Sequence, residues 1–415
     1  MFGTDNCRES IKGCRKVSVN GKMIERRNDF GIYRTNEKLT YLDYAATTFM
    51  PDIVIESWEN YQKKIGVACN RGDGPLSEKA QEIYDVSKNE ILSFFDANYR
   101  YDLLHGKNAT ECLNLLVCAL EYMITPGDII LMGPYEHHSN IIPWSECAKR
   151  KGACLVQMPL LENGKIDYSF VSRIDTQKIR ILSISAVSNV NSYVLDMDWV
   201  KNMIANTNAF TILDVSQAVG HRRMSFETIG ADAYVMSAHK MYGPKNVGAV
   251  IVKKERIEAM HPFLFGGGMV WNSLGANPQW QPGYRKFEAG TFDVGLLEAW
   301  ATACQYLNAI GMDNIGSSDK EIYKAVKSRM NNKCYHIVPG GEESASMISF
   351  SVDVMHPHDV GRIASKNNFE IRTGHMCSQA ALNILGFTSL CRLSWGIGSC
   401  SDDVLRFFEV LEGEM

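Results

Sequence analysis

Short apolar runs alternate with helical patterns through the middle of the chain. Residues 110–122, 142–151 and 198–205 have apolar positions three or four apart and predict helices. Predicted strands lie between and after them: DIILM, ACLVQM, IRILSIS, FTILD and AYVMS. This order is typical of a mainly parallel sheet covered on both faces. The run NVGAVIVKK follows a Gly-Pro turn too closely for a helical crossover, so we expect it to enter antiparallel.

The two ends of the chain have different patterns. Residues 1–39 are polar without sustained periodicity and predict a mobile extension, while the Gly-rich, aromatic residues 265–290 predict loops and a lobe boundary. The later elements are a helix at 295–310, helix EIYKAVKSRM, strand MISFSV, helix HDVGRIASK, strands FEIR and CRLSWGI, and helix DDVLRFFEVL. We therefore expect a polar extension at 1–39, a large domain at 40–290 and a smaller α+β domain at 291–415.

Composition excludes several classes of protein. The 415 residues are 45% hydrophobic and 22% charged, with a net charge of -4, which gives no reason to expect nucleic acid or an anionic membrane as partner. Twelve cysteines without a C-x-x-C pair favour reduced thiols, and we predict no metal site. The N-terminus lacks the apolar stretch of a secretory signal, and no apolar run approaches the ~20 residues of a membrane span. We expect a soluble cytoplasmic enzyme.

Two predicted strands end in residues suited to a cofactor. Asp214 ends FTILD and Gln217 follows it, at the sheet edge where ligands bind. Such a carboxylate can pair with the protonated ring nitrogen of pyridoxal phosphate, and Gln217 can bond the ring hydroxyl. AYVMS leads into Ser237 and His239, which are phosphate-binding candidates, and into Lys240, which can form an imine with the cofactor. Alone, Asp214 reads as a helix cap and Lys240 as a surface lysine, but their place after successive strands favours the site.

Several longer segments match a known family in the same order. They are YLDYAATT from residue 41, NRG (70–72), NATECLN (108–114), EHHSNIIPW (136–144), VSNV (187–190), DVSQAV (214–219), SAHKMYGP (237–244), FGGGM (265–269), FEAGT (287–291) and RTGHMCSQ (372–379). The chain resembles the class V aminotransferase superfamily, and within it the sulfur-mobilising (SUF-type, group II) cysteine desulfurases. The resemblance implies an α/β fold-type I transferase: a large, mainly parallel sheet domain with a smaller C-terminal domain.

The resemblance also assigns cofactor contacts. His137 matches the histidine stacked on the ring, a candidate proton shuttle, and Asn189 matches the residue near the ring hydroxyl and the substrate. Ala109 and Thr110 fall where the family cups the phosphate at a helix N-terminus. Thr291 matches a contact to the phosphate of the neighbouring subunit, which implies a homodimer. Without the resemblance, these residues read as a loop histidine, a turn former, a helix N-cap and an ordinary turn.

The sulfur chemistry is likewise implied by the resemblance. Cys377 matches the catalytic cysteine, which takes sulfur from L-cysteine as a persulfide, leaves L-alanine and passes the sulfur to an acceptor protein, as in iron–sulfur cluster biogenesis. Lys240 acts as the base, while His375 or Arg372 favours the thiolate. Arg392 matches the arginine that holds the substrate carboxylate, a group that a guanidinium binds through both oxygens.

Departures from the family pattern leave other activities open. The departures are Asn70, Ala186, Asn191, Phe292 and residues 398–400 (Gly-Ser-Cys), and we expect them on the substrate side of the site. They are compatible with a related pyridoxal-phosphate C–S or selenocysteine lyase, or with a biosynthetic enzyme acting on a modified cysteine. A catalytically silent scaffold that binds a sulfur-transfer partner is a further alternative, although Lys240 and Cys377 are intact.

Overall fold

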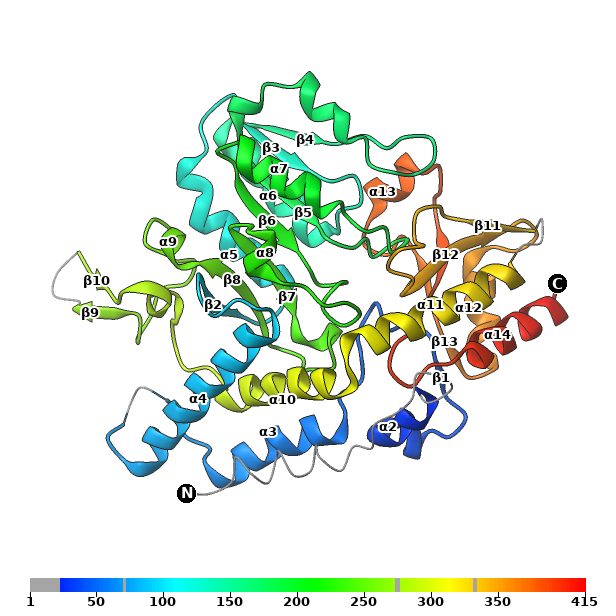
Figure 1. Cartoon of the computed structure of the whole chain (residues 1–415), viewed down its shortest axis with the longest axis horizontal. Coiled ribbons are helices and arrows are strands. Elements are labelled where there is room, and N and C mark those ends of the chain that lie inside the picture. Colours follow the sequence, from blue (N-terminus) through cyan, green and yellow to red (C-terminus); the bar gives the residue numbers. More distant parts are fainter. Residues whose placement is uncertain (1–22, 70–71, 273–276, 331–333) are drawn as a thin grey trace.

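The computed structural model describes residues 23–69, 72–272, 277–330 and 334–415. Its centre is a seven-stranded sheet with the order β2-β8-β7-β6-β5-β3-β4 (Figure 1). These strands are β2 Tyr101–Gly106, β3 Ile129–Met132, β4 Cys154–Gln157, β5 Ile179–Ser185, β6 Phe210–Asp214, β7 Ala233–Ser237 and β8 Gly248–Lys253. Strands β3 to β7 run parallel to one another, whereas β8 is antiparallel to both β2 and β7. The mainly parallel sheet and its antiparallel β8 are thus confirmed.

Helices cover the large sheet on both faces. The helices of the chain are α2 Gly31–Thr35, α3 Asp52–Lys64, α4 Pro75–Phe94, α5 Ala109–Leu120, α6 His138–Lys151, α7 Met197–Asn206, α8 Phe226–Ile229, α9 Lys254–Ile257, α10 Val294–Ile310, α11 Met312–Arg329, α12 Pro357–Lys366, α13 Gln379–Ile384 and α14 Ser401–Gly413. Alternate strand residues enter two cores: on β3, Ile130 and Met132 belong to the core under α5 and α6, and Leu131 belongs to the opposite core. Burial on both faces explains why these strands are mostly apolar and do not alternate between apolar and polar residues.

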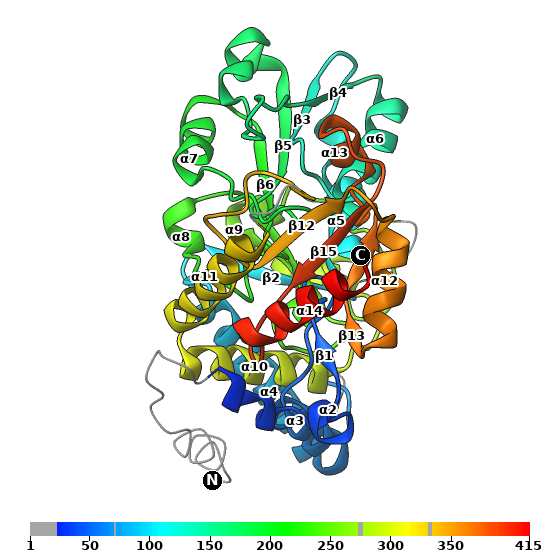
Figure 2. The same ribbon diagram turned by 90° about the vertical axis from the view of Figure 1, so that its right-hand side faces the viewer.

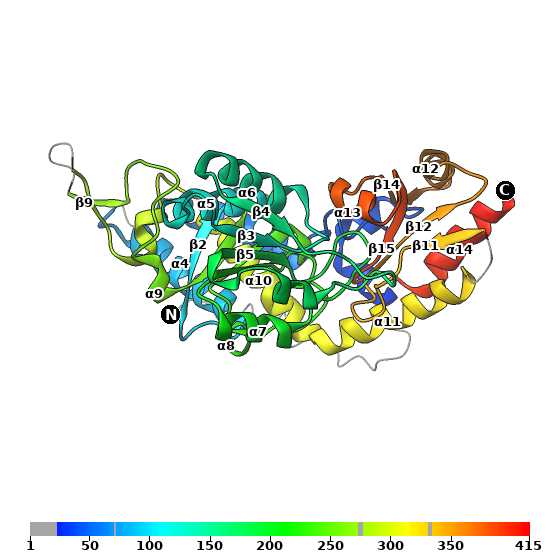
Figure 3. The ribbon, with the colours of Figure 1, turned by 90° about the horizontal axis from the view of Figure 1, so that it is seen from above.

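A second, antiparallel sheet forms the smaller lobe, with the order β11-β12-β15-β14. The remaining strands are β1 Thr40–Tyr41, β9 Val270–Asn272, β10 Gln279–Trp280, β11 Tyr335–Ile337, β12 Met347–Val352, β13 Phe369–Glu370, β14 Arg372–Gly374 and β15 Leu390–Ser394. Helices α11, α12 and α14 lie with this sheet (Figure 2), and its core includes Phe350, Leu393 and Phe408. Seen from above, α10 and α11 run from the large lobe toward the small one (Figure 3).

The described part of the N-terminal region packs onto the folded body. A 3-10 helix at Ile24–Asp29 precedes α2, and Phe30 between them is fully buried. The Tyr306 hydroxyl on α10 donates to Asp29 Oδ2 at 2.8 Å, and Arg27 forms an ion pair with Asp403. The expected mobile extension is therefore wrong for residues 23–39. A single buried aromatic residue such as Phe30 can hold short helical turns in place, and such an anchor produces no periodic pattern in the sequence. Residues 1–22 lie outside the described residues.

Other sequence-based boundaries need adjustment. Helix α6 begins at His138, four residues before the predicted residue 142, and contains Pro143 in its first turns. The predicted strand FEIR is two short strands, β13 and β14. Helix α10, which follows residue 290, packs on α3 and α4, and β1, which follows residue 39, pairs with β13 near the C-terminal end of the chain. Contacts therefore cross both expected domain boundaries, and the boundaries at 39 and 290 stay predictions. Among the described residues, no helix has the length and apolarity needed to cross a membrane.

Candidate active site

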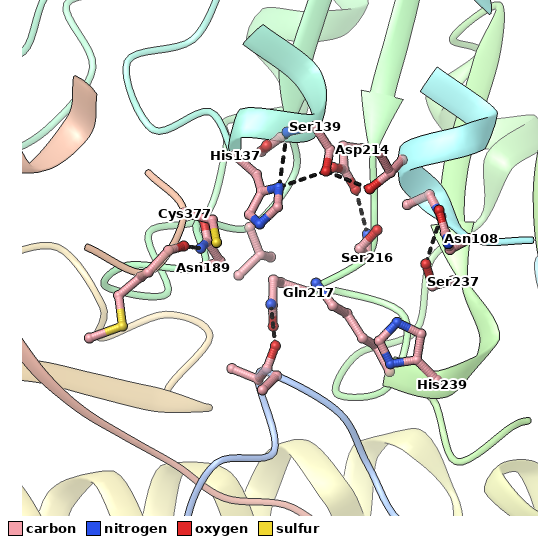
Figure 4. Close-up of a pocket in the computed structure, with 18 of the residues that line it drawn as sticks. Asn108, His137, Ser139, Asn189, Asp214, Ser216, Gln217, Ser237, His239 and Cys377 are labelled. Atoms are coloured by element: carbon pink, nitrogen blue, oxygen red, sulfur yellow. Dashed lines mark hydrogen bonds between the residues drawn. The ribbon is translucent and has the colours of Figure 1, made fainter. Parts of the chain in front are cut away.

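A cavity of about 320 Å³ opens at the carboxyl ends of β5, β6 and β7. The N-termini of α5 and α6 and a small-lobe segment after β14 close its other sides (Figure 4). Most of the residues predicted from the sequence line it: Ala109, Thr110, His137, Asn189, Asp214, Gln217, Ser237, His239, Lys240, Arg372, Cys377 and Arg392. Thr291 and His375 do not line the cavity, and both are exposed. The fold thus brings together most of the predicted site, from segments far apart in the sequence.

One end of the cavity offers hydrogen-bond donors to an anion. Asn108 caps α5, its side chain accepting from the Glu111 N–H at 3.0 Å. The Ser237 hydroxyl accepts from the Ala109 N–H at 2.7 Å, and Thr110 Oγ1 lies 2.6 Å from Ser139 Oγ. Free N–H groups and the helix dipole at such a terminus favour a phosphate. This end of the cavity therefore fits the phosphate predicted there.

Asp214 ends β6 with its carboxylate beside the cavity. Asp214 is 7% exposed, and the Ser216 N–H donates to its Oδ1 at 3.0 Å. Gln217 is also buried, and its Nε2 donates to the Ala45 carbonyl at 2.9 Å. That bond fixes the Gln217 amide but leaves its oxygen available to a ligand. A buried carboxylate held by a backbone donor is suited to a cationic ring nitrogen.

Lys240 follows β7 in a single turn of 3-10 helix and reaches the same cavity. Burial lowers the pKa of Lys240, and this effect outweighs the opposite effect of the Asp214 carboxylate. Among the described residues, its amine has no hydrogen-bonding or ion-pair partner. Desolvation favours the neutral form of such an amine, which is its nucleophilic and basic form.

His137 and His239 are neutral at the edge of the cavity. His137 caps α6: its Nδ1 accepts from the Ser139 N–H at 3.1 Å, which places the proton of the neutral ring on Nε2. Burial, with Lys240 nearby, lowers the pKa of His137 to about 4, and the same causes lower the pKa of His239 to about 4. His239 Nδ1 lies 3.1 Å from Thr47 Oγ1. Neutral imidazoles can stack on a ring or hydrogen-bond a phosphate without adding charge.

Arg392 on β15 lies at the small-lobe side of the cavity with two partners. Its Nη2 donates to Asp43 Oδ1 at 2.8 Å and its Nη1 to the Asn189 carbonyl at 2.8 Å, while Nε is buried without a partner among the described residues. Burial lowers the pKa of Arg392, and Asp43 opposes the effect. Arg372 pairs opposite Arg392 across β14 and β15. Two adjacent guanidinium groups, one with a free donor, suit a substrate carboxylate.

Cys377 is the thiol that lines this cavity. It is exposed in the segment between β14 and α13, where Met376 (φ 55°) and Cys377 (φ 54°) both have left-handed backbone conformations. Burial raises the pKa of Cys391 to about 12 and also raises that of Cys400, and neither lines the cavity. Geometry and access therefore favour Cys377 over these two thiols as a nucleophile.

The departures from the family pattern do not cluster on the substrate side, contrary to expectation. Ala186, Asn191, Phe292 and residues 398–400 all lie outside the cavity, and Asn70 lies outside the described residues. Asn191 donates to the Pro339 carbonyl at 2.6 Å, and Phe292 stacks on His105 at 4.6 Å. Asn191 and Phe292 thus serve contacts between segments around the site.

Sequence reasoning missed several residues that shape the site. Asp43 holds Arg392, Ser216 holds Asp214, and Ser139 links His137 to Thr110. Glu136 is 1% exposed and accepts from the Ser185 N–H at 2.9 Å, behind the cavity wall. The signal for Asp43 and Glu136 was present, since both belong to the segments YLDYAATT and EHHSNIIPW that carried the resemblance.

The site and the fold together define a class of enzyme. A lysine with a lowered pKa, a carboxylate at the neighbouring strand end and an anion-binding helix terminus surround one cavity, and these groups fit pyridoxal phosphate. The chain matches the family "Aminotransferase class-V" over residues 40–407, and it belongs to this family of pyridoxal-phosphate enzymes.

Known relatives point to one branch of the family. A "Probable cysteine desulfurase" of Streptomyces coelicolor is 30% identical over 398 residues, covering 93% of this chain and 95% of the relative. A "Cysteine desulfurase" of Wigglesworthia glossinidia brevipalpis is 30% identical over 399 residues, covering 95% and 97%. The solved apo structure of a cysteine desulfurase from Thermococcus onnurineus NA1 is similar with a TM-score of 0.89 and 26% identity, covering 94% of this chain and 97% of that one.

Proposed function

We propose that this chain is a pyridoxal-phosphate-dependent cysteine desulfurase with Cys377 as its sulfur acceptor. The reaction converts L-cysteine and the Cys377 thiol into L-alanine and a Cys377 persulfide. The observation that carries the proposal is one cavity lined by Lys240, Asp214, Arg392 and an exposed cysteine thiol. The curated relatives named as cysteine desulfurases support it over nearly the whole chain.

The cofactor would be held by residues from both ends of the cavity. Ser237, His239 and the N-terminus of α5 would bind its phosphate, and Asp214 would pair with its ring nitrogen. His137 would lie against its ring, and Lys240 would be its covalent attachment point. When bound, pyridoxal phosphate supplies an electron-accepting ring that acidifies the substrate Cα–H and weakens the Cβ–S bond.

The protein's own groups then divide the work of orientation and proton transfer. The guanidinium of Arg392 would hold the substrate carboxylate, with Arg372 adding positive charge nearby. The amine of Lys240 would take the proton from Cα, a role that its lowered pKa favours. The Nε2–H of neutral His137 would donate a hydrogen bond within the cavity.

Sulfur transfer is a displacement at the substrate sulfur. The Cys377 thiolate attacks that sulfur, so an S–S bond forms as the Cβ–S bond breaks, and the carbon receives a proton to give alanine. The two electrons of the broken bond stay with carbon, so carbon is reduced while the sulfur pair becomes a persulfide. The exposure of Cys377 leaves the persulfide open to an acceptor molecule.

The test is to incubate the purified, cofactor-loaded protein with L-cysteine. We expect equal amounts of alanine and total sulfide in the presence of a reductant, and a persulfide on Cys377 by alkylation and peptide mass spectrometry. Pyruvate and ammonia in place of alanine would overturn the desulfurase in favour of a C–S lyase. A preference for L-selenocysteine over L-cysteine would favour a selenocysteine lyase.

We further propose the setting in which the enzyme acts. Thr291 is exposed next to Gly290 (φ 87°), outside its own cavity, so a homodimer in which it completes the partner's phosphate site is consistent with its position. An acceptor protein, in the manner of SUF-type enzymes of iron–sulfur cluster biogenesis, would take the sulfur in the cytoplasm. Sedimentation at micromolar concentration tests the dimer: a fully active monomer would contradict it.

A further inference from the structure

The loop that carries Cys377 is held at three successive residues. Asn189 Nδ2 donates to the Met376 carbonyl at 2.6 Å, and the His138 N–H donates to the Cys377 carbonyl at 2.8 Å. The Ser378 hydroxyl donates to Asn189 Oδ1 at 2.9 Å. The side chain of Asn189 therefore contacts the loop on both sides of Cys377, as a donor to Met376 before it and as an acceptor from Ser378 after it. Figure 4 shows Asn189 beside Cys377.

These contacts restrain a backbone that would otherwise relax. Met376 and Cys377 have φ values of 55° and 54°, which non-glycine residues adopt at a cost in free energy unless their surroundings impose them. Met376 is 4% exposed and Ser378 is fully buried, whereas the Cys377 side chain between them is exposed. The two buried neighbours thus fix the backbone while the thiol stays accessible at the cavity.

Asn189 is itself anchored by a residue of the site. It is 6% exposed, and its main-chain carbonyl accepts from Arg392 Nη1 at 2.8 Å. A continuous chain of hydrogen bonds therefore runs from Arg392 through Asn189 to Ser378, joining the carboxylate-binding side of the cavity to the thiol loop. Within the described part of the chain, the second amide hydrogen of Asn189 has no acceptor, so a contact to the cofactor ring is compatible with this role.

We infer that Asn189 is a positioning residue for Cys377, with Ser378 as its partner, and that together they hold the thiol where it meets the substrate sulfur. The loop contacts stand on geometry alone, whereas the purpose of holding the thiol rests on the proposed function. Ser378 does not line the cavity, so its replacement separates the role in the loop from any contact to cofactor or substrate.

The test compares Ser378→Ala with Gln379→Ala in the cofactor-loaded protein. Gln379 is the exposed next residue, so its side chain serves as the matched control. For Ser378→Ala we expect amide hydrogen exchange in residues 372–380 to rise about 2- to 10-fold, the range for losing one neutral hydrogen bond. We also expect kcat for alanine formation to fall several-fold, while the KM for cysteine and the cofactor absorbance spectrum stay as in the wild type.

Equal exchange in Ser378→Ala and Gln379→Ala would overturn the inference, and so would faster exchange with an unchanged kcat. Should Ser378→Ala fail to fold, Asn189→Asp provides the second test, since a carboxylate still accepts from Ser378 but cannot donate to the Met376 carbonyl. Its loop should also exchange faster than that of the wild type. Fast exchange in a protein whose wild type forms no alanine would refute the desulfurase function and leave the loop contacts standing.

Discussion

The carboxylate of Asp43 lies 2.8 Å from Nη2 of Arg392, although 349 residues separate the two in the chain. The Arg392 side chain is 4% exposed and that of Asp43 is 13% exposed, so the pair is largely shielded from water. Their ion pair joins the segment after β1 to the small-lobe sheet and fixes the guanidinium at the edge of the cavity.

Asp43→Ala should destabilise the protein, because it leaves the Arg392 charge buried without its partner. We expect the free energy of unfolding to fall by about 3 kcal/mol, the usual cost of breaking a buried pair. Denaturant unfolding of Asp43→Ala, Arg392→Met and the double variant measures it. The second substitution should cost much less once the first is present; additive losses would show that the pair is not coupled.

Lys240→Ala should remove covalent cofactor attachment and all turnover, because it is the amine with a lowered pKa in this cavity. Borohydride reduction followed by peptide mapping should place the cofactor on Lys240 in the wild type. Lys245→Ala, an exposed lysine five residues later, is the matched control and should keep both the visible absorbance and the activity. Labelling of a different lysine would contradict the assignment of the site.

Cys377→Ser should bind cofactor and cysteine but lose the sulfur-transfer step. We expect alanine formation to fall at least about 100-fold, which corresponds to about 2.7 kcal/mol in the activation barrier, because a hydroxyl is a poor nucleophile toward sulfur. Cys154→Ser, at an exposed cysteine on β4, should retain full activity. Alanine production by Cys377→Ser at the wild-type rate would move the sulfur acceptor to another thiol or to elimination chemistry.

The buried Glu136 should make stability depend on pH. Burial raises its pKa to about 7, while the unfolded value is near ~4.5. The folded state thus holds its proton more tightly, so the stabilisation is fully present below pH ~4.5 and is lost as pH rises to about 7, by on the order of 3 kcal/mol.

The measurement is the free energy of unfolding between pH 5 and 8 for the wild type and Glu136→Gln. The lowered pKa values of His137 and His239 make stability rise with pH over the lower part of this range, the opposite of the effect of Glu136. These two histidines are present in both proteins, so their contribution is the same in each. The difference between the two curves therefore isolates Glu136. A constant difference across the range would mean that Glu136 keeps one protonation state on folding.

The central fold could be predicted from the sequence because its strands are buried on both faces. β7 reads as an apolar run up to its last residue, and the polar residues Ser237, His239 and Lys240 at its end line the cavity. The predicted start of α6 at residue 142 is four residues too late, because the helix contains Pro143, a residue that usually marks a helix boundary.

The contacts that organise the thiol loop have no local signal in the sequence. Asn189 and Met376 are 187 residues apart, and nothing in VSNV or RTGHMCSQ indicates that one side chain bonds the other's backbone. Similarly, Phe30 is surrounded by charged and polar neighbours, so its complete burial depends on a surface formed by distant segments, including Tyr306.

The pairing of β1 with β13 has a consequence for the order in which the protein is built. During synthesis, Asp43 leaves the ribosome long before Arg392, whereas β2 to β8 are all complete by residue 253. The lysine-bearing sheet can therefore fold while the C-terminal lobe is still being translated. The part of the site around Arg392 therefore forms last, when β13 and β15 come to lie beside β1 and Asp43.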